Sequence, residues 1–146
     1  MKIQIREGTI DEVLSVYQSI PEFQNAPAKK AYEQRLFHSN RYLILIACNY
    51  TQPVGFKVGY EKDADGSFYS WMGGVANEYR RHGVAGQLMD VMIQWAKDQG
   101  YTTLRFKTRN CFKPMLIFGI KRGFDIYGIE PRETLEDYRI LLEKRL

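Results

Sequence analysis

Residues 73–88 decide the fold, and they read Gly73-Gly74-Val75-Ala76-Asn77-Glu78-Tyr79-Arg80-Arg81-His82-Gly83-Val84-Ala85-Gly86-Gln87-Leu88. A strand-like run ends at Val75, a polar turn follows, and an apolar stripe at helical spacing begins at Val84. Gly83, Ala85 and Gly86 allow a ligand to approach the backbone closely. The first amides of a helix are unpaired and carry its positive dipole end, so they favour an anion. The stretch therefore predicts a strand–loop–helix unit suited to a pyrophosphate.

The segments on either side extend this unit into a crossover. The run Phe68–Val75 is expected to be a strand. The helix stripe continues through Leu88, Met92 and Trp95, and Gly100 closes the helix as a C-terminal glycine. Thr102–Thr108 is predicted as the next strand. A strand, a helix and a strand in this order indicate two parallel strands joined by a crossover helix.

The rest of the chain supplies further strands and helices. Thr9 and Glu12 form a capping box that starts a helix, and Pro21 is expected to end it. Other predicted helices cover residues 28–37 and 115–122. Further strands are predicted at residues 2–6, 42–48, 54–60, 124–129 and 138–142. We expect an α/β fold with a mixed sheet, helices on both faces, and one domain over residues 1–146.

The amino-acid composition limits the kinds of function that we expect for this chain. The chain has 146 residues, 45% of them hydrophobic, with a net charge of +4 and a pI of about 9.0. The excess of basic over acidic residues is compatible with an anionic ligand or with a solvated basic surface. No aromatic-rich basic motif supports nucleic-acid binding. With only His38, His82 and two separated cysteines, no metal-ligand spacing or disulfide framework is recognisable. No signal peptide or membrane span is seen, which favours a reduced, cytoplasmic protein.

The pattern Arg80-x-x-Gly83-x-Ala85 resembles the acetyl-CoA loop of the GNAT acetyltransferase superfamily, Q/R-x-x-G-x-G/A. It is neither a GxGxxG fingerprint nor a P-loop. A second similarity is Asn110 followed by a short helix and the pair Gly123-Phe124. The alternative is a plain helix start with a basic surface cluster. The resemblance covers essentially the whole chain and implies a mostly antiparallel sheet with a splayed central strand pair.

The same resemblance implies acetyl-CoA as cosubstrate, with no metal, and assigns residues to it. The pantetheine arm would lie along Gly74, Val75 and Ala76, and Asn110 would contact the same region. The pyrophosphate would be held by Arg80, Arg81, His82, Gly83, Val84, Ala85 and Gly86. Some alternatives stay open: Asn110 as a turn-former, His82 as an exposed side chain, and Lys121-Arg122 as a solvated face rather than a 3′-phosphate contact.

The resemblance further implies direct attack of a neutral amine on the thioester. An amide near Val75 would stabilise the oxyanion. Family members often have a tyrosine acid where this chain has Gly119, so the acid is open: Tyr127, water, or none. Glu22 is a candidate base or acceptor-binding residue, or a solvated loop carboxylate. Phe23 is a candidate acceptor contact. Tyr69 and Trp71 share one strand face and would wall the acceptor site, or else pack in the core.

These features predict an N-acetyltransferase that acts on a primary amine of a small-molecule or peptide acceptor, with a compact acceptor favoured. A homodimer is plausible for such a family, and no nucleic-acid or membrane partner is expected. The alternative is a non-catalytic acetyl-CoA sensor, because the usual tyrosine is missing at Gly119. Turnover of any amine would exclude that alternative.

Overall fold

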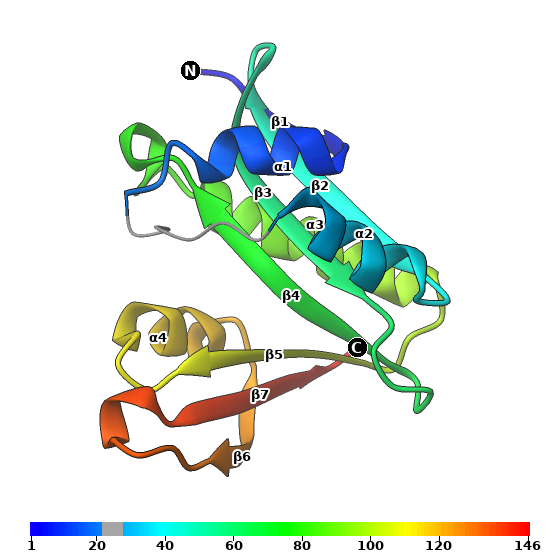
Figure 1. Ribbon diagram of the computed structural model, residues 1–146, viewed down its shortest axis with the longest axis vertical. Helices are drawn as coiled ribbons and strands as arrows, with labels where there is room; N and C mark the ends of the chain where they lie inside the picture. Colours follow the sequence, from blue (N-terminus) through cyan, green and yellow to red (C-terminus); the bar gives the residue numbers. More distant parts are fainter. Residues whose placement is uncertain (22–27) are drawn as a thin grey trace.

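The computed structural model describes residues 1–21 and 28–146 and contains one seven-stranded sheet, in the order β1-β2-β3-β4-β5-β7-β6 (Figure 1). The strands are β1 (Ile3–Glu7), β2 (Tyr42–Asn49), β3 (Gln52–Tyr60), β4 (Ser67–Val75), β5 (Thr103–Arg109), β6 (Asp125–Glu130) and β7 (Arg139–Arg145). The helices are α1 (Ile10–Tyr17), α2 (Lys29–Phe37), α3 (Val84–Asp98) and α4 (Lys113–Lys121). Short 3₁₀ helices cover η1 (Asn77–Tyr79) and η2 (Leu135–Asp137).

Helices cover both faces of the sheet and create two apolar cores. Helices α1 and α2 pack on one face of β2–β4 around Phe56, Val58 and Tyr32. Helix α3 packs on the other face around Phe68, and α4 contributes partly buried apolar side chains to the same core. Figure 1 shows α1 and α2 in front of the sheet and α3 behind it.

Five of the six strand pairings are antiparallel, and β4 with β5 is the parallel one. The β4–β5 pairing begins at Ser67 with Thr103 and stops at Ser70 with Phe106. Beyond that point the two strands diverge, which Figure 1 shows as a V opening toward α4. This confirms the expected fold class: a mixed, mostly antiparallel sheet with a splayed central pair.

A β-bulge lies where the splay begins. Met72 pairs with Val58 and Ser70 pairs with Gly59, so Trp71 is the extra residue on β4. A bulge reverses the face to which the following side chains point. Gly73 therefore shares the α3 face with Lys57, its direct partner on β3.

Four predicted boundaries were wrong by two residues or more, and one of them is the start of β3, which begins at Gln52 instead of Val54. Helix α1 ends at Tyr17 instead of Pro21, because Ser19 and Ile20 donate to carbonyls three residues back and form a tight turn. Helix α4 begins at Lys113 instead of Met115, because Pro114 suits the first turn of a helix. Strand β7 continues to Arg145, since its charged end pairs with β5.

None of the helices in residues 1–21 and 28–146 combines the length and the apolar character needed to cross a lipid bilayer.

Candidate functional site

The loop before α3 is built from two left-handed backbone positions. Arg81 has φ of 63° and Gly83 has φ of 77°. The left-handed region costs a non-glycine residue about 1–2 kcal/mol, so strain is stored at Arg81. A Cβ placed on Gly83 would meet no atom within 4 Å. The approach to the first turn of α3 is thus open at Gly83, as the phosphate site of the sequence analysis requires.

Two hydrogen bonds fix this loop to the sheet. The Ala76 N–H donates to the Val54 carbonyl over 2.8 Å, and Arg80 Nε donates to the Val75 carbonyl over 3.1 Å. Arg80 therefore folds back onto the end of β4, whereas Arg81 and His82 are exposed beside the helix start. The loop geometry is set by backbone anchoring, which leaves those two side chains accessible.

The splayed end of β4 carries the three residues assigned to the pantetheine arm. Gly74 and Val75 are half-buried, Ala76 is buried, and Gly73 just before them is exposed. Because pairing with β5 has already stopped at Ser70, the β5 side of this segment is open for an added extended chain.

Arg122, for which the sequence left open a solvated face or a 3′-phosphate contact, lies near the start of α3. The side chain is half-buried and packs over the Phe118 ring, 4.7 Å from its centroid. A Cβ on Gly86 would collide with its guanidinium, so Arg122 lies against the first turn of α3. Its Nε is buried and has no hydrogen-bond partner in residues 1–21 and 28–146. The charge and the unsatisfied donor fit a phosphate group at this helix start.

Asn110 makes two bonds inside the chain. Its Nδ2 donates to the Leu135 carbonyl over 3.0 Å, and its Oδ1 accepts from Lys113 Nζ over 2.9 Å. The side chain thus ties the end of β5 to η2 and the start of α4. A contact with the coenzyme would require one of these bonds to be exchanged.

The position of the missing tyrosine is filled by neighbours. Gly119 is buried in α4, and a Cβ there would lie 2.7 Å from Phe106 Cζ and 3.3 Å from Leu142 Cδ2. The Phe106 ring also packs on Phe124 at 5.0 Å between centroids. A phenylalanine from β5 therefore occupies the space that a side chain at Gly119 would need.

Tyr69 and Trp71 lie on the α1–α2 face and share one aromatic neighbour. Their rings are 5.7 Å and 5.9 Å from that of Tyr60, and both are half-buried. The Arg35 guanidinium lies 4.5 Å from the Trp71 ring centroid. Burial raises the pKa of Tyr69 to about 12. The two side chains pack on the core and keep partly exposed surfaces, and their role as a wall of the acceptor site stays a prediction.

Tyr127 lies at a bulge of β6, three strands from β4, with Arg105 5.3 Å from its ring centroid. Burial, more than any neighbouring charge, raises its pKa above the ordinary value. Glu22 and Phe23 lie outside the described residues.

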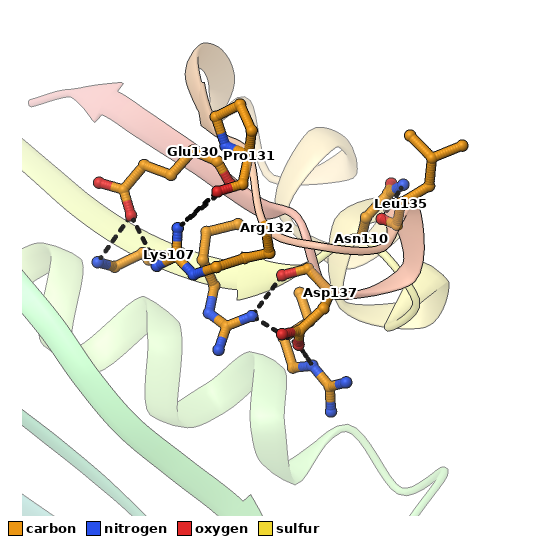
Figure 2. A network of polar contacts seen from close by, with 9 residues as sticks. Lys107, Asn110, Glu130, Pro131, Arg132, Leu135 and Asp137 are labelled. Carbon is orange, nitrogen blue, oxygen red and sulfur yellow. Dashed lines mark hydrogen bonds and ion pairs between the residues drawn. The ribbon is translucent and has the colours of Figure 1, made fainter.

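An ion-pair network extends over the α1–α2 face of β5 and β7 and into the β6–β7 loop (Figure 2). Asp137 accepts from Arg109 Nε at 2.7 Å and from Arg139 Nη1 at 2.8 Å, and hydrogen bonding to Arg139 lowers its pKa. Lys107 lies 3.4 Å from Glu130, and its charge lowers the pKa of that carboxyl. The sequence offered no pattern that predicted this network, because its members come from three separate stretches of the chain.

In the described part of the chain, no group of three or more His, Cys, Asp or Glu side chains is arranged to hold a metal ion.

The sequence profile of the Acetyltransferase (GNAT) family matches residues 10–124, which is more than half of the chain. No curated protein matches the sequence.

Several solved structures share the fold. The ribosomal-protein-S18-alanine N-acetyltransferase from Escherichia coli is 14% identical with a TM-score of 0.82, covering 99% of this chain and 94% of that one. A chain of the NatC complex bound to Gag peptide and CoA is 21% identical with a TM-score of 0.84, covering 100% and 99%. A GNAT family acetyltransferase from Elizabethkingia anophelis with acetyl-CoA bound is 24% identical with a TM-score of 0.75, covering 99% and 98%.

Proposed function

The chain belongs to the acetyltransferase (GNAT) family, and from this premise we propose that it moves the acetyl group of acetyl-CoA to a primary amine, with residues 1–146 as one catalytic domain. The observation that carries the proposal is the open approach at Gly83, beside the unpaired amides of α3. Two of the similar structures contain coenzyme A or acetyl-CoA, which supports the same ligand here.

The coenzyme would be held mainly by backbone. The amides from Arg81 to Gly86 would bind the pyrophosphate, with His82 at its edge and Arg122 supplying charge from α4. The open side of β4 at Gly74, Val75 and Ala76 would pair with the pantetheine arm, and Asn110 would approach it from the end of β5. Arg80 would act by holding Val75 in place through its 3.1 Å bond.

The acceptor would enter on the α1–α2 face. Tyr69 and Trp71 would form one wall, and Glu22 and Phe23, between α1 and α2, would form another. The Glu22 carboxylate would bind the ammonium group or remove its proton. The NatC structure contains a peptide and the Escherichia coli neighbour is named for a protein alanine, so peptides belong in the first acceptor panel with small amines.

In this reaction a neutral amine attacks the acetyl carbon as the thiolate leaves. The amide near Val75 would donate to the oxygen on which negative charge develops. Tyr127 stays a candidate acid for the thiolate, and Tyr127→Phe would test it by loss of kcat at constant KM.

A second candidate function is a sensor that binds acetyl-CoA without turnover. The observation that favours it is the filled space at Gly119, since Phe106 occupies the region where a tyrosine acid would stand. Saturable binding of acetyl-CoA without acetylation of any small amine or peptide in a broad panel would support the sensor. Turnover of one amine would exclude it.

The first test is thermal stability with and without acetyl-CoA, using two matched variants. Binding at about 100 times Kd stabilises a protein by about 2.7 kcal/mol, which raises Tm by roughly 5–10 °C for a chain of this size. Gly83→Glu places a carboxylate at the coenzyme loop. Gly100→Glu is the control, because Gly100 also has positive φ and no atom within 4 Å, but it lies at the other end of α3.

We expect the Tm rise in the wild type and in Gly100→Glu, and its loss in Gly83→Glu. Absence of a rise in the wild type at saturating acetyl-CoA would overturn the proposed function. An equal rise in Tm in all three proteins would show that the coenzyme does not bind at the Gly83 loop.

A further inference from the structure

Lys57 is a buried lysine beside the part of β4 that no longer pairs with β5. It lies on β3 directly opposite Gly73 and is only 7% exposed. A Cβ placed on Gly73 would lie 3.8 Å from Lys57 Cγ and 3.7 Å from Nζ, so the side chain extends across β4 where Gly73 has none. Gly73 is exposed, and β4 is already separated from β5 at that point. The amine therefore lies over Gly73, three residues beyond the last β4–β5 pair at Ser70.

The surroundings of Lys57 carry no compensating charge. On the same strand face, a Cβ on Gly55 would lie 3.2 Å from Val84, and one on Gly59 would lie 3.0 Å from Met92, so α3 covers this face. Its partner on β2 is Leu45. Asp90 is on the exposed side of α3 and Arg122 lies against Gly86, and neither contributes to the Lys57 pKa.

Burial is therefore the one cause that lowers the pKa of Lys57, to about 8. No hydrogen bond or ion pair of the Lys57 side chain occurs in the described part of the chain. An unpaired ammonium in an apolar layer destabilises the fold. A methionine would fill the same space without that cost, so the lysine calls for a functional explanation.

We propose that Lys57 is a catalytic acid of this protein, whose ammonium protonates the coenzyme sulfur when the acetyl group is transferred. The inference rests on the proposed function, because the sulfur must reach the open edge of β4 for Lys57 to meet it.

The step balances in atoms and charge. Lys57 Nζ gives one proton to the sulfur while the carbon–sulfur bond breaks and the acceptor nitrogen bonds to the acetyl carbon. The products are coenzyme A as a thiol, a neutral Lys57 amine, and an acetylated nitrogen with one excess proton. Loss of that proton to the Lys57 amine, directly or through solvent, yields the neutral amide and restores the ammonium.

Two observations make the role chemically reasonable. The position of the usual tyrosine is Gly119, whose side-chain space Phe106 fills on the same face of the sheet. A lysine with a pKa of about 8 is protonated at neutral pH and closely matched to an alkyl thiol such as cysteine, near 8.5. Proton transfer between matched groups needs little driving force.

The test titrates the thiol of bound coenzyme A, so it requires no acceptor. The ultraviolet absorbance of the thiolate is followed against pH in the wild type, Lys57→Met and Lys57→Arg, with desulfo-coenzyme A as the blank. An ammonium near the sulfur favours the thiolate, and a nearby opposite charge shifts a pKa by about 1–3 units. We expect the thiol ionisation constant in the wild type to exceed that in Lys57→Met at least about tenfold. Lys57→Arg should resemble the wild type, because arginine keeps the charge.

Once an amine is found that the wild type acetylates, both variants should lose kcat, since arginine cannot release its proton near neutral pH. Equal thiol titrations in the wild type and Lys57→Met, with coenzyme A bound by both, would overturn the inference and leave the proposed function intact. Loss of desulfo-coenzyme A binding in Lys57→Met would also overturn it, because Lys57 would then hold the arm instead of the sulfur. Failure of the wild type to bind coenzyme A would overturn the proposed function itself.

Discussion

The two halves of the sheet on either side of the splay are built from different interactions. The N-terminal half-sheet, β1–β4, has α1 and α2 on one face and α3 on the other, and its buried side chains are almost all apolar. The C-terminal half-sheet, β5, β7 and β6, has α4 on one face and ion pairs on the other. It also carries exposed apolar residues at Ile126 and Ile129 on its edge strand β6.

This difference in packing is suited to a binding site at the boundary between the two half-sheets. Apolar packing on both faces fixes β4 and the loop at Gly83 in one geometry, as backbone recognition of a coenzyme requires. Ion pairs between half-exposed side chains are worth little each and can be exchanged, so they hold the β6–β7 loop less firmly than apolar packing would. We therefore expect substitutions in the N-terminal half-sheet to change stability more than those in the C-terminal half-sheet.

The largest effect is expected from Phe56→Ala, which removes a ring that is 0% exposed in the N-terminal half-sheet. Loss of such a ring costs about 3–5 kcal/mol of unfolding free energy. Ile129→Ala is the matched change in the C-terminal half-sheet, where the side chain is 56% exposed, and surface changes usually stay within about 0.5 kcal/mol. Urea denaturation measures both. Similar losses of unfolding free energy in the two variants would contradict the expected difference between the two half-sheets.

Lys57→Met tests the one buried charged side chain among the described residues of the N-terminal half. Burial lowers the lysine pKa from 10.5 to about 8, so between these values the unfolded chain binds more protons and the wild type gains stability as pH rises. Below about pH 8 the full penalty applies, up to roughly 3 kcal/mol. We expect Lys57→Met to be the more stable protein at pH 7, with a gap that narrows toward pH 10. A gap independent of pH would show that Lys57 titrates normally.

Gly119→Ala tests the junction of α4 with β5. The new Cβ would lie 2.7 Å from Phe106 Cζ, and overpacking of this kind costs about 1–3 kcal/mol. The better helix propensity of alanine offsets up to about 1 kcal/mol. Adding Phe106→Leu should reduce the penalty, so a double-mutant cycle by urea denaturation should give a nonzero coupling. Strict additivity would mean that the two side chains do not compete for the same space.

The smallest effect is expected from Asp137→Asn in the ion-pair network. Hydrogen bonding to Arg139 lowers the Asp137 pKa, so its stabilising contribution is present above the unfolded value and is lost as pH falls through the native one. At pH 7 the Tm change should be comparable with the scatter of repeat scans, and the two proteins should converge in acid. A large fall in Tm would show that the C-terminal half-sheet depends on this network after all.

The sequence predicted most of this fold because its signals are local. Thr9 and Glu12 do form the predicted capping box, and Gly83 does precede the first turn of α3 in a left-handed conformation. The bulge at Trp71 had no such signal, since the register of two distant strands creates it. The apolar alternation in β3 could not show that α3 buries the strand face that carries Lys57.

The same limit applies to the candidate site. The loop from Arg80 to Gly86 is contiguous and was visible as a pattern, whereas Arg122 reaches it from another helix. The pairing of Asp137 with Arg109 and Arg139 depends on how β5 and β7 meet. Contacts between segments far apart in sequence cannot be read from the spacing of residues within one segment.

The crossing of Lys57 over Gly73 also limits how these two positions can evolve. A Cβ at Gly73 would be in ordinary contact with the lysine stem at 3.8 Å, so alanine fits there, but a branched side chain would displace the amine from the edge of β4. A relative that acquires valine or isoleucine at the glycine must therefore lose or reroute the lysine. A lineage that replaces the lysine first can then accept valine or isoleucine in place of the glycine. A lineage that replaces the glycine first cannot keep the lysine in this position. We therefore expect relatives to carry the lysine only where its cross-strand partner is glycine or alanine.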